Sequence, residues 1–159
     1  MTKLVPEGYH TVTPSVTFKD SQRAIEFYKK AFGAEVLSLF PSPVGKGVMH
    51  ATIRIGNSIL MMADEIFGQA CKSAETLGIS PISLYIYTQD VDMMFKRALQ
   101  AGAVETMPVA DMFWGDRCGT LADPFGHKWS IATHKEDLTS EEIKRRGRIW
   151  MEKQKQPAS

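Results

Sequence analysis

Alternating polar and apolar residues predict a strand over residues 10–18. Its polar face carries Thr11, Thr13, Ser15 and Thr17, and its apolar face carries Val12, Pro14, Val16 and Phe18. This period of two is typical of a half-buried strand. Because Pro14 has no N–H to donate to a neighbour, we expect the strand at a sheet edge. A helix capped by Asp20 follows, with apolar residues at helical spacing and Gly33 at its end.

The same order of elements then occurs twice along the chain. Three strands are predicted over 35–40, 48–55 and 58–62, with a hairpin turn at Gly56-Asn57 between the last two. The stretch 64–80 has no clear period and is expected to be a connection. The second copy has a strand over 82–88, a helix capped by Asp90 and ended by Gly102, and three further strands; the last two flank a turn at Asp123-Pro-Phe-Gly126.

The spacing of matching residues indicates an internal duplication of a βαβββ unit. Asp20 and Asp90 are 70 positions apart, as are Gly56 and Gly126. We therefore predict an α+β fold with helices outside and a curved, mostly antiparallel sheet around a cup. We expect one domain: module one over 10–64, a connection over 65–80, module two over 81–134, and an extra C-terminal helix over 139–154. That helix begins at a Thr139–Glu142 capping box and is expected to reach across a partner subunit.

Composition narrows the possible partners. The 159 residues are 43% hydrophobic and carry 19 Lys and Arg against 18 Asp and Glu, a net charge of +1. This balance gives no basic field for nucleic acid, and no apolar run approaches the roughly 20 residues that span a bilayer. The two cysteines match no metal or redox spacing. We expect a cytoplasmic protein with neither nucleic acid nor a membrane as partner.

Three motifs resemble one known family. Val48-Met-His-Ala51, Phe113-Trp-Gly-Asp-Arg117 and Asp123-Pro-Phe-Gly-His-Lys-Trp129, set in a doubled βαβββ plan, resemble the glyoxalase, bleomycin-resistance and extradiol-dioxygenase superfamily, also called vicinal oxygen chelate proteins. The resemblance covers about residues 10–134 and is strongest to the PhnB-like subgroup, whose members mostly lack an assigned reaction. It implies two modules around a cup in which four side chains, typically His, Gln or Glu, hold a divalent metal.

The residues that the resemblance places at those four positions are weak ligands. They are Thr13, Met61 (or Leu60 if the register slips by one), Ser83 and Ser130. Hydroxyl groups are weak neutral donors, and a thioether prefers copper(I) to Mg, Mn, Fe or Zn. We therefore expect no metal and no cofactor, and the Lewis-acid chemistry of the superfamily does not carry over.

The predicted cup is lined by small polar and aromatic side chains, which suit a small polar or anionic ligand held by hydrogen bonds. The predicted ligand-binding residues are Thr13, Ser15, His50, Arg54, Met61, Ser83, Tyr85, Trp114, Arg117 and Ser130. A strand with one solvated face has the same composition, so a purely structural origin is the alternative.

Several of these residues have a specific alternative. Arg54 and Arg117 have the guanidinium fork that binds carboxylate or phosphate, but each also fits an ion pair, Arg117 with Asp116 or Asp123. Trp114 either stacks on a ligand or closes the end of the core. The four histidines (His10, His50, His127 and His134) have no metal-ligand spacing.

The leading hypothesis is a metal-independent small-molecule binding protein that forms a homodimer. The alternative is an isomerase, lyase or transferase acting on a small polar metabolite, with His50 or Tyr87 as the proton carrier. A structural role for His50 is the competing interpretation. A third possibility is an interaction module whose cup is filled by its own side chains.

Overall fold

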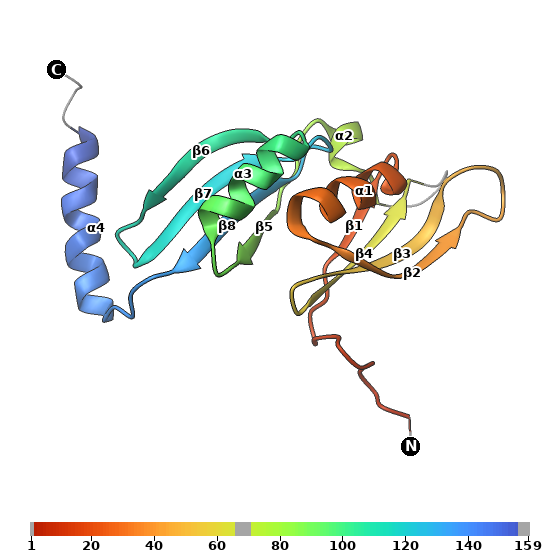
Figure 1. Cartoon of the computed structure of the whole chain (residues 1–159), viewed down its shortest axis with the longest axis horizontal. Coiled ribbons are helices and arrows are strands. Elements are labelled where there is room, and N and C mark those ends of the chain that lie inside the picture. The colour runs from red at the N-terminus through yellow and green to blue at the C-terminus, as the bar shows by residue number, and fades with distance from the viewer. Residues whose placement is uncertain (1, 66–70, 156–159) are drawn as a thin grey trace.

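A computed structural model describes residues 2–65 and 71–155, which form two modules with the same order of elements (Figure 1). The first module consists of β1 (Ser15–Phe18), α1 (Ser21–Phe32), β2 (Glu35–Pro41), β3 (Val48–Ile55) and β4 (Ser58–Asp64). The second consists of β5 (Ser83–Tyr87), α3 (Val91–Ala101), β6 (Val104–Asp111), β7 (Asp116–Ala122) and β8 (Lys128–His134). The α+β class and the duplicated plan are confirmed.

Each module builds its own four-stranded sheet. The first sheet has the order β1-β4-β3-β2 and the second has the order β5-β8-β7-β6. In both, the opening strand runs parallel to the last strand, and the other neighbours are antiparallel. A parallel pair cannot be joined by a tight hairpin, and α1 and α3 carry the chain from the first strand across the sheet to the strand at its opposite edge. The helices therefore cover one face of each sheet and leave the other face uncovered; we call the latter the open face.

The predicted helix ends are confirmed. The Asp20 carboxylate accepts a hydrogen bond from the Arg23 amide (3.0 Å), and the Asp90 carboxylate accepts one from the Met93 amide (2.9 Å). Gly33 and Gly102 end the two helices in the left-handed conformation, with φ of 68° and 116°. Glycine adopts this conformation without the penalty that a Cβ would add.

The first strand is shorter than the alternation predicts. β1 begins at Ser15, at the edge of its sheet as expected, and the Pro14 carbonyl accepts a hydrogen bond from the Met61 amide (2.9 Å). Thr13 lies before the strand, where its hydroxyl donates to the His10 carbonyl (2.9 Å). A side chain that bonds its own backbone in this way favours a turn over a ladder, which explains why the alternation overestimates the strand.

The connection between the modules contains a helix that the sequence pattern does not predict. This helix, α2 (Ala74–Leu77), is capped by Ser73, whose hydroxyl accepts from the Thr76 amide (3.1 Å). Glu65 accepts hydrogen bonds from the Ser73 amide and the Thr76 hydroxyl, which lower the pKa of its carboxyl group. Residues 66–70 of the predicted connection lie outside the described part of the chain.

One aromatic core joins the two modules. The Phe32 and Trp129 ring centroids are 4.7 Å apart, and the Phe18 and Phe125 centroids are 5.9 Å apart. α1 and α3 also pack against each other (Figure 1), and the Arg97 side chain donates to backbone carbonyls at the end of α1. Because both modules turn their helical sides to this shared core, their open faces point away from it.

A buried carboxylate lies at the centre of this core. Asp123, in the β7–β8 turn, is only 6% exposed. One carboxylate oxygen accepts from the backbone amides of Phe125 and His127 (2.9 Å each), and the other accepts from the Tyr28 hydroxyl (2.6 Å) and the Trp129 indole (2.9 Å). Burial, followed by the charge of Asp123, raises the pKa of Tyr28 well above its ordinary value, so this hydroxyl stays a donor.

The C-terminal helix α4 (Ser140–Lys155) stands apart from the sheets at one end of the molecule (Figure 1). It has no buried residue; its contacts include a tilted contact between the Trp150 and Phe113 rings (centroids 5.7 Å apart) and an ion pair of Arg146 with Glu136 (3.0 Å). Half of the predicted capping box is present, because the Thr139 hydroxyl accepts from the Glu142 amide (3.2 Å). The Glu142 carboxylate instead binds Arg145 and Arg146, which lower its pKa to about 2.

Among the described helices, we find none with the length and apolar character that crossing a membrane requires.

We expect Asp123→Ala to lower the free energy of unfolding by about 3–5 kcal/mol, since it leaves four donors without an acceptor in a buried site. Tyr28→Phe removes one of those donors and should cost about 2 kcal/mol. Urea denaturation followed by tryptophan fluorescence measures both. Glu105→Ala, which removes an exposed carboxylate on β6, is the control and should stay within about 0.5 kcal/mol. A loss below roughly 1 kcal/mol for Asp123→Ala would contradict the role assigned to this carboxylate.

Candidate functional site

The register of the strands places one row of side chains across each open face. In the first sheet this row is Ser15, Met61, Thr52 and Ser38, and in the second sheet it is Tyr85, Ser130, Thr120 and Met107. Met61 and Ser130 thus occupy matching positions in the two modules. Leu60, the alternative to Met61, lies opposite Ile53 on the core side and is 5% exposed.

At two of the four positions implied by the resemblance, the strand register places a different residue from the one obtained by counting along the sequence. Thr13 lies before β1, so Ser15 is the residue opposite Met61. Ser83 is exposed and lies opposite Lys128, whereas Tyr85 lies opposite Ser130. The rows therefore pair Ser15 with Met61 and Tyr85 with Ser130.

The donor atoms in these rows do not fit a catalytic divalent metal. They are alcohol and phenol hydroxyls and the thioethers of Met61 and Met107, with neither an imidazole nor a carboxylate among them. Across residues 2–65 and 71–155, no three His, Cys, Asp or Glu side chains form a group that could hold a metal ion. We therefore derive no chemical step through a metal at these positions.

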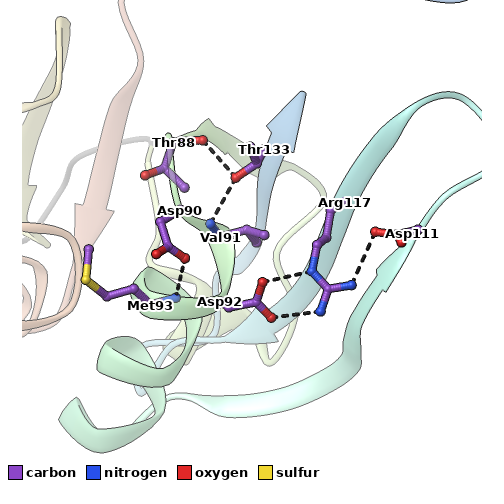
Figure 2. Close-up of polar contacts among 8 residues, drawn as sticks. All are labelled: Thr88, Asp90, Val91, Asp92, Met93, Asp111, Arg117 and Thr133. Atoms are coloured by element: carbon purple, nitrogen blue, oxygen red, sulfur yellow. Dashed lines mark hydrogen bonds and ion pairs between the residues drawn. The ribbon is translucent and has the colours of Figure 1, made fainter. Parts of the chain in front are cut away.

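Arg117 lies on the helical side of the second sheet rather than on its open face (Figure 2). Its Nε and Nη2 donate to the two carboxylate oxygens of Asp92 at the start of α3 (2.8 Å each), and its Nη1 donates to Asp111 (3.2 Å). These hydrogen bonds raise the pKa of Arg117 and lower that of Asp92. The predicted ion pair of Arg117 with Asp116 or Asp123 is wrong, because both of those carboxylates bind other side chains.

A residue next to Arg117 in space explains why α3 begins where it does. Thr133, opposite Arg117 in the sheet, accepts a hydrogen bond from the Val91 amide and donates one to the Thr88 carbonyl, both at 2.9 Å (Figure 2). Arg117 and Thr133 together hold the first turn of α3 against the sheet. The contacts of Arg117 are thus those of a structural ion pair, the alternative named for it.

Arg54 and His50 are on the open face of the first sheet. Arg54 donates through Nη2 to the Glu35 carboxylate on β2, in an exposed ion pair. His50 is half-buried, with Nε2 3.1 Å from the Thr52 hydroxyl and its ring 6.4 Å from that of Phe40. The hydrogen bonds found for His50 among the described residues include no carboxylate that would orient it as a general base.

The second sheet carries a buried carboxylate on its open face. Asp116 is 3% exposed; one oxygen accepts from the Tyr87 hydroxyl (3.0 Å) and the Trp114 indole (3.2 Å), and the other is 2.7 Å from Nδ1 of His134. Burial and the hydrogen bond to Asp116 raise the pKa of Tyr87. Next to it, the Tyr85 hydroxyl donates to the Cys118 sulfur (3.4 Å), and burial followed by this contact raises the pKa of Tyr85.

The structure thus brings together three predicted site residues, Tyr85, Tyr87 and Trp114, and places Ser130 opposite Tyr85. The sequence interpretation missed Asp116 and His134 as their partners. One signal was available: Asp116 and Cys118 alternate with Arg117 along β7, so they share the face opposite to it. Trp114 is half-buried and held by Asp116 and by an edge contact with Phe113, an arrangement that favours the alternative of closing the end of the core.

His134 is placed between two carboxylates. Its Nδ1 lies against Asp116 and its Nε2 is 3.0 Å from Asp137, in the segment leading to α4. The hydrogen bonds to Asp116 and then to Asp137 raise the pKa of His134 above its ordinary value of 6.5. His127 behaves in the opposite way, because burial against Phe18 lowers its pKa.

Comparison with known proteins places the rows of both open faces, together with Asp116 and Tyr87 but not His134, inside one family match. The model of the Glyoxalase/Bleomycin resistance protein/Dioxygenase superfamily matches residues 9–131. An uncharacterized protein of Mycobacterium tuberculosis is 38% identical over 135 residues, covering 83% of this chain and 79% of that protein.

Two solved structures share the fold. TioX from Micromonospora sp. ML1 is similar with a TM-score of 0.63 and 26% identity, covering 79% of this chain and 98% of that chain. A putative 3-demethylubiquinone-9 3-methyltransferase, the PhnB protein of Bacillus cereus, is similar with a TM-score of 0.62 and 21% identity, covering 78% and 99%. The resemblance seen in the sequence motifs is confirmed.

The contacts of His134 predict a specific pH dependence of stability. A raised pKa means that the folded state favours the imidazolium, so the stabilisation is complete below about pH 6.5 and is lost as the pH rises through the raised pKa. His134→Asn keeps a neutral donor near Asp116 but cannot be protonated. The difference in urea midpoint between wild type and this variant should be largest near pH 5.5 and shrink toward pH 8.5. A difference independent of pH would refute the ionic contact; His10→Asn controls for removal of a histidine elsewhere.

Proposed function

Because the chain belongs to the Glyoxalase/Bleomycin resistance protein/Dioxygenase superfamily, we propose that it binds a small molecule on its open faces without a metal. The observation that supports this most directly is the composition of the two rows across those faces. They keep the register of the fold but carry hydroxyl groups, two thioethers and a tyrosine in place of strong metal ligands. Such a surface forms hydrogen bonds with a ligand without polarising it as a Lewis acid does.

We infer that the ligand is polar. Ser15 is exposed and Ser130 is half-buried, and each hydroxyl can both donate and accept. An anionic ligand group has an accessible cation on each open face, Arg54 on the first and the exposed Lys128, two residues from Ser130, on the second. The exposed pair of Arg54 with Glu35 contributes little stability and can exchange for a ligand carboxylate at low cost. Arg117 is held on the other side of its sheet and does not serve this role.

We propose that a second copy of the chain completes the site. In one chain the two open faces point away from the shared core, so each is half of a cup. Phe40 of β2 lies opposite His50 on the first open face, and it and the neighbouring exposed Leu37 gain by being covered. In a homodimer, the first sheet of one chain and the second sheet of its partner would enclose one ligand.

One observation favours an enzyme as the second candidate function. The Tyr87 hydroxyl, Asp116 and His134 form a continuous hydrogen-bonded chain that reaches the open face. The pKa of Tyr87 is raised, so the phenol stays protonated, and to act as the proton carrier it would have to release its bond to Asp116 and turn toward a bound metabolite. His50, the other candidate, has Thr52 as its contact and not a carboxylate.

A thermal-shift screen of small polar metabolites tests the binding function. A ligand at 100 times its dissociation constant should raise the free energy of unfolding by about 2.7 kcal/mol. Ser130→Leu should weaken a confirmed ligand at least about tenfold, since one buried hydroxyl without its partner costs about 1–3 kcal/mol. Ser58→Leu, at the β3–β4 hairpin, is the matched control. His50→Ala should leave affinity nearly unchanged; turnover that disappears in this variant while binding persists would favour the enzyme.

Sedimentation analysis tests the dimer. We expect a species of twice the 17.8 kDa chain mass. Phe40→Asp should weaken association at least about tenfold, because it places an unpaired charge in the proposed interface. Leu77→Asp changes an equally exposed apolar residue on α2 and should have no effect. A monomer at all concentrations would exclude a cup built from two chains.

A further inference from the structure

Two tyrosines on the open face of the second sheet are exposed although their hydroxyl groups are held in place. Tyr85 is 47% exposed and Tyr87 is 65% exposed, with ring centroids 5.1 Å apart and an angle of 41° between the planes. Large aromatic side chains gain free energy by burial, so a pair left accessible to solvent is not explained by the stability of the chain.

Both side chains cross a neighbouring strand. They start on β5, and their hydroxyl groups reach Cys118 and Asp116 on β7. Because β8 lies between β5 and β7, each ring passes over β8. Ala132, opposite both Tyr87 and Cys118, is fully buried beneath them. The two side chains therefore extend along the sheet from β5 toward β7, with their ring planes inclined by 41° to each other.

The hydrogen bonds at their ends fix this arrangement before any ligand arrives. Asp116 and Cys118 are 3% and 2% exposed, so the anchoring atoms belong to the rigid interior. A binding surface that is already ordered avoids the entropy cost of immobilising its side chains. Asp116 also accepts from Trp114 and His134, so its charge is already compensated and gives no strong attraction for a cationic ligand.

We propose that Tyr85 and Tyr87 form a platform for a flat aromatic group of the ligand, which stacks on one ring while the other ring, inclined by 41°, contacts its edge. The inference rests on the proposed small-molecule function and adds the chemical class of the ligand: a planar aromatic ring system carrying a polar substituent. Ser130 lies opposite Tyr85, and Thr120 follows it in the same row, so their hydroxyl groups border the platform where such a substituent would sit. Stacking on an aromatic side chain depends on the π face of the ligand and tolerates variation at its edge.

A matched pair of probes tests this directly. Naphthalene-2-carboxamide and its fully saturated decahydro analogue carry the same amide on ring systems of similar size, but only the first has a π face. Titration of the full chain, followed by ligand-observed NMR, should give an affinity at least about tenfold higher for the aromatic probe. Tyr87→Leu combined with Tyr85→Leu should remove this preference.

Two further variants separate stacking from other effects. Tyr87→Phe keeps the ring but loses the bond to Asp116, and should weaken the aromatic probe by a smaller factor of about two to five, as expected for lost pre-organisation. Trp150→Leu removes an exposed aromatic ring on α4, away from the platform, and should change nothing. Unchanged thermal melting of each variant shows that the fold is intact.

The outcomes separate this inference from the function on which it rests. Equal binding of the two probes, or unchanged binding after the double tyrosine substitution, would overturn the platform. If the thermal-shift screen finds ligands whose binding is unchanged when both tyrosines are replaced, the platform is also overturned. The small-molecule binding function is then still supported. Absence of any ligand, together with tyrosine rings covered by a second copy of the chain, would overturn both.

Discussion

The arrangement of the two modules depends on the buried carboxylate of Asp123. It accepts hydrogen bonds from its own turn, from Trp129 on β8 and from Tyr28 on α1, so one charged group ties three segments from both modules. A buried carboxylate is tolerated only when its oxygens are satisfied, and each of these donors is in turn fixed by aromatic packing. The helical sides of both modules are therefore held against each other, and the open faces are directed outward.

Local chemistry predicts much of this fold. Asp20, Asp90, Gly33 and Gly102 mark helix ends because capping is decided within a few residues, and the spacing of 70 reveals the duplication. The sequence identifies Asp123 only as a turn residue. Its contact with Tyr28 joins residues 95 positions apart, and nothing in the local pattern specifies such a pair.

The candidate site was harder to predict for the same reason. Whether Ser83 or Tyr85 lies opposite Ser130 is a question of register, and a shift of two residues leaves the alternation of faces unchanged. Arg117 was assigned to a ligand or to a nearby acid, but its partner Asp92 comes from α3 and is brought close by the packing of that helix on the sheet. Ion pairs between separate elements follow from tertiary structure rather than from sequence spacing.

At each end of the β7–β8 hairpin, a buried aspartate accepts hydrogen bonds from a tyrosine and a tryptophan. One end lies in the core and the other on the open face. At the turn, Asp123 binds a tyrosine and a tryptophan inside the core; at the other end, Asp116 binds Tyr87 and Trp114 on the open face. The hydrogen-bond donors to Asp123 are neutral groups shielded from solvent. Asp116 has the half-exposed His134 as an additional partner. Protonation of His134 therefore changes the charge beside the tyrosine platform, so the hairpin couples a rigid aromatic core at its turn to an ionisable contact on the open face.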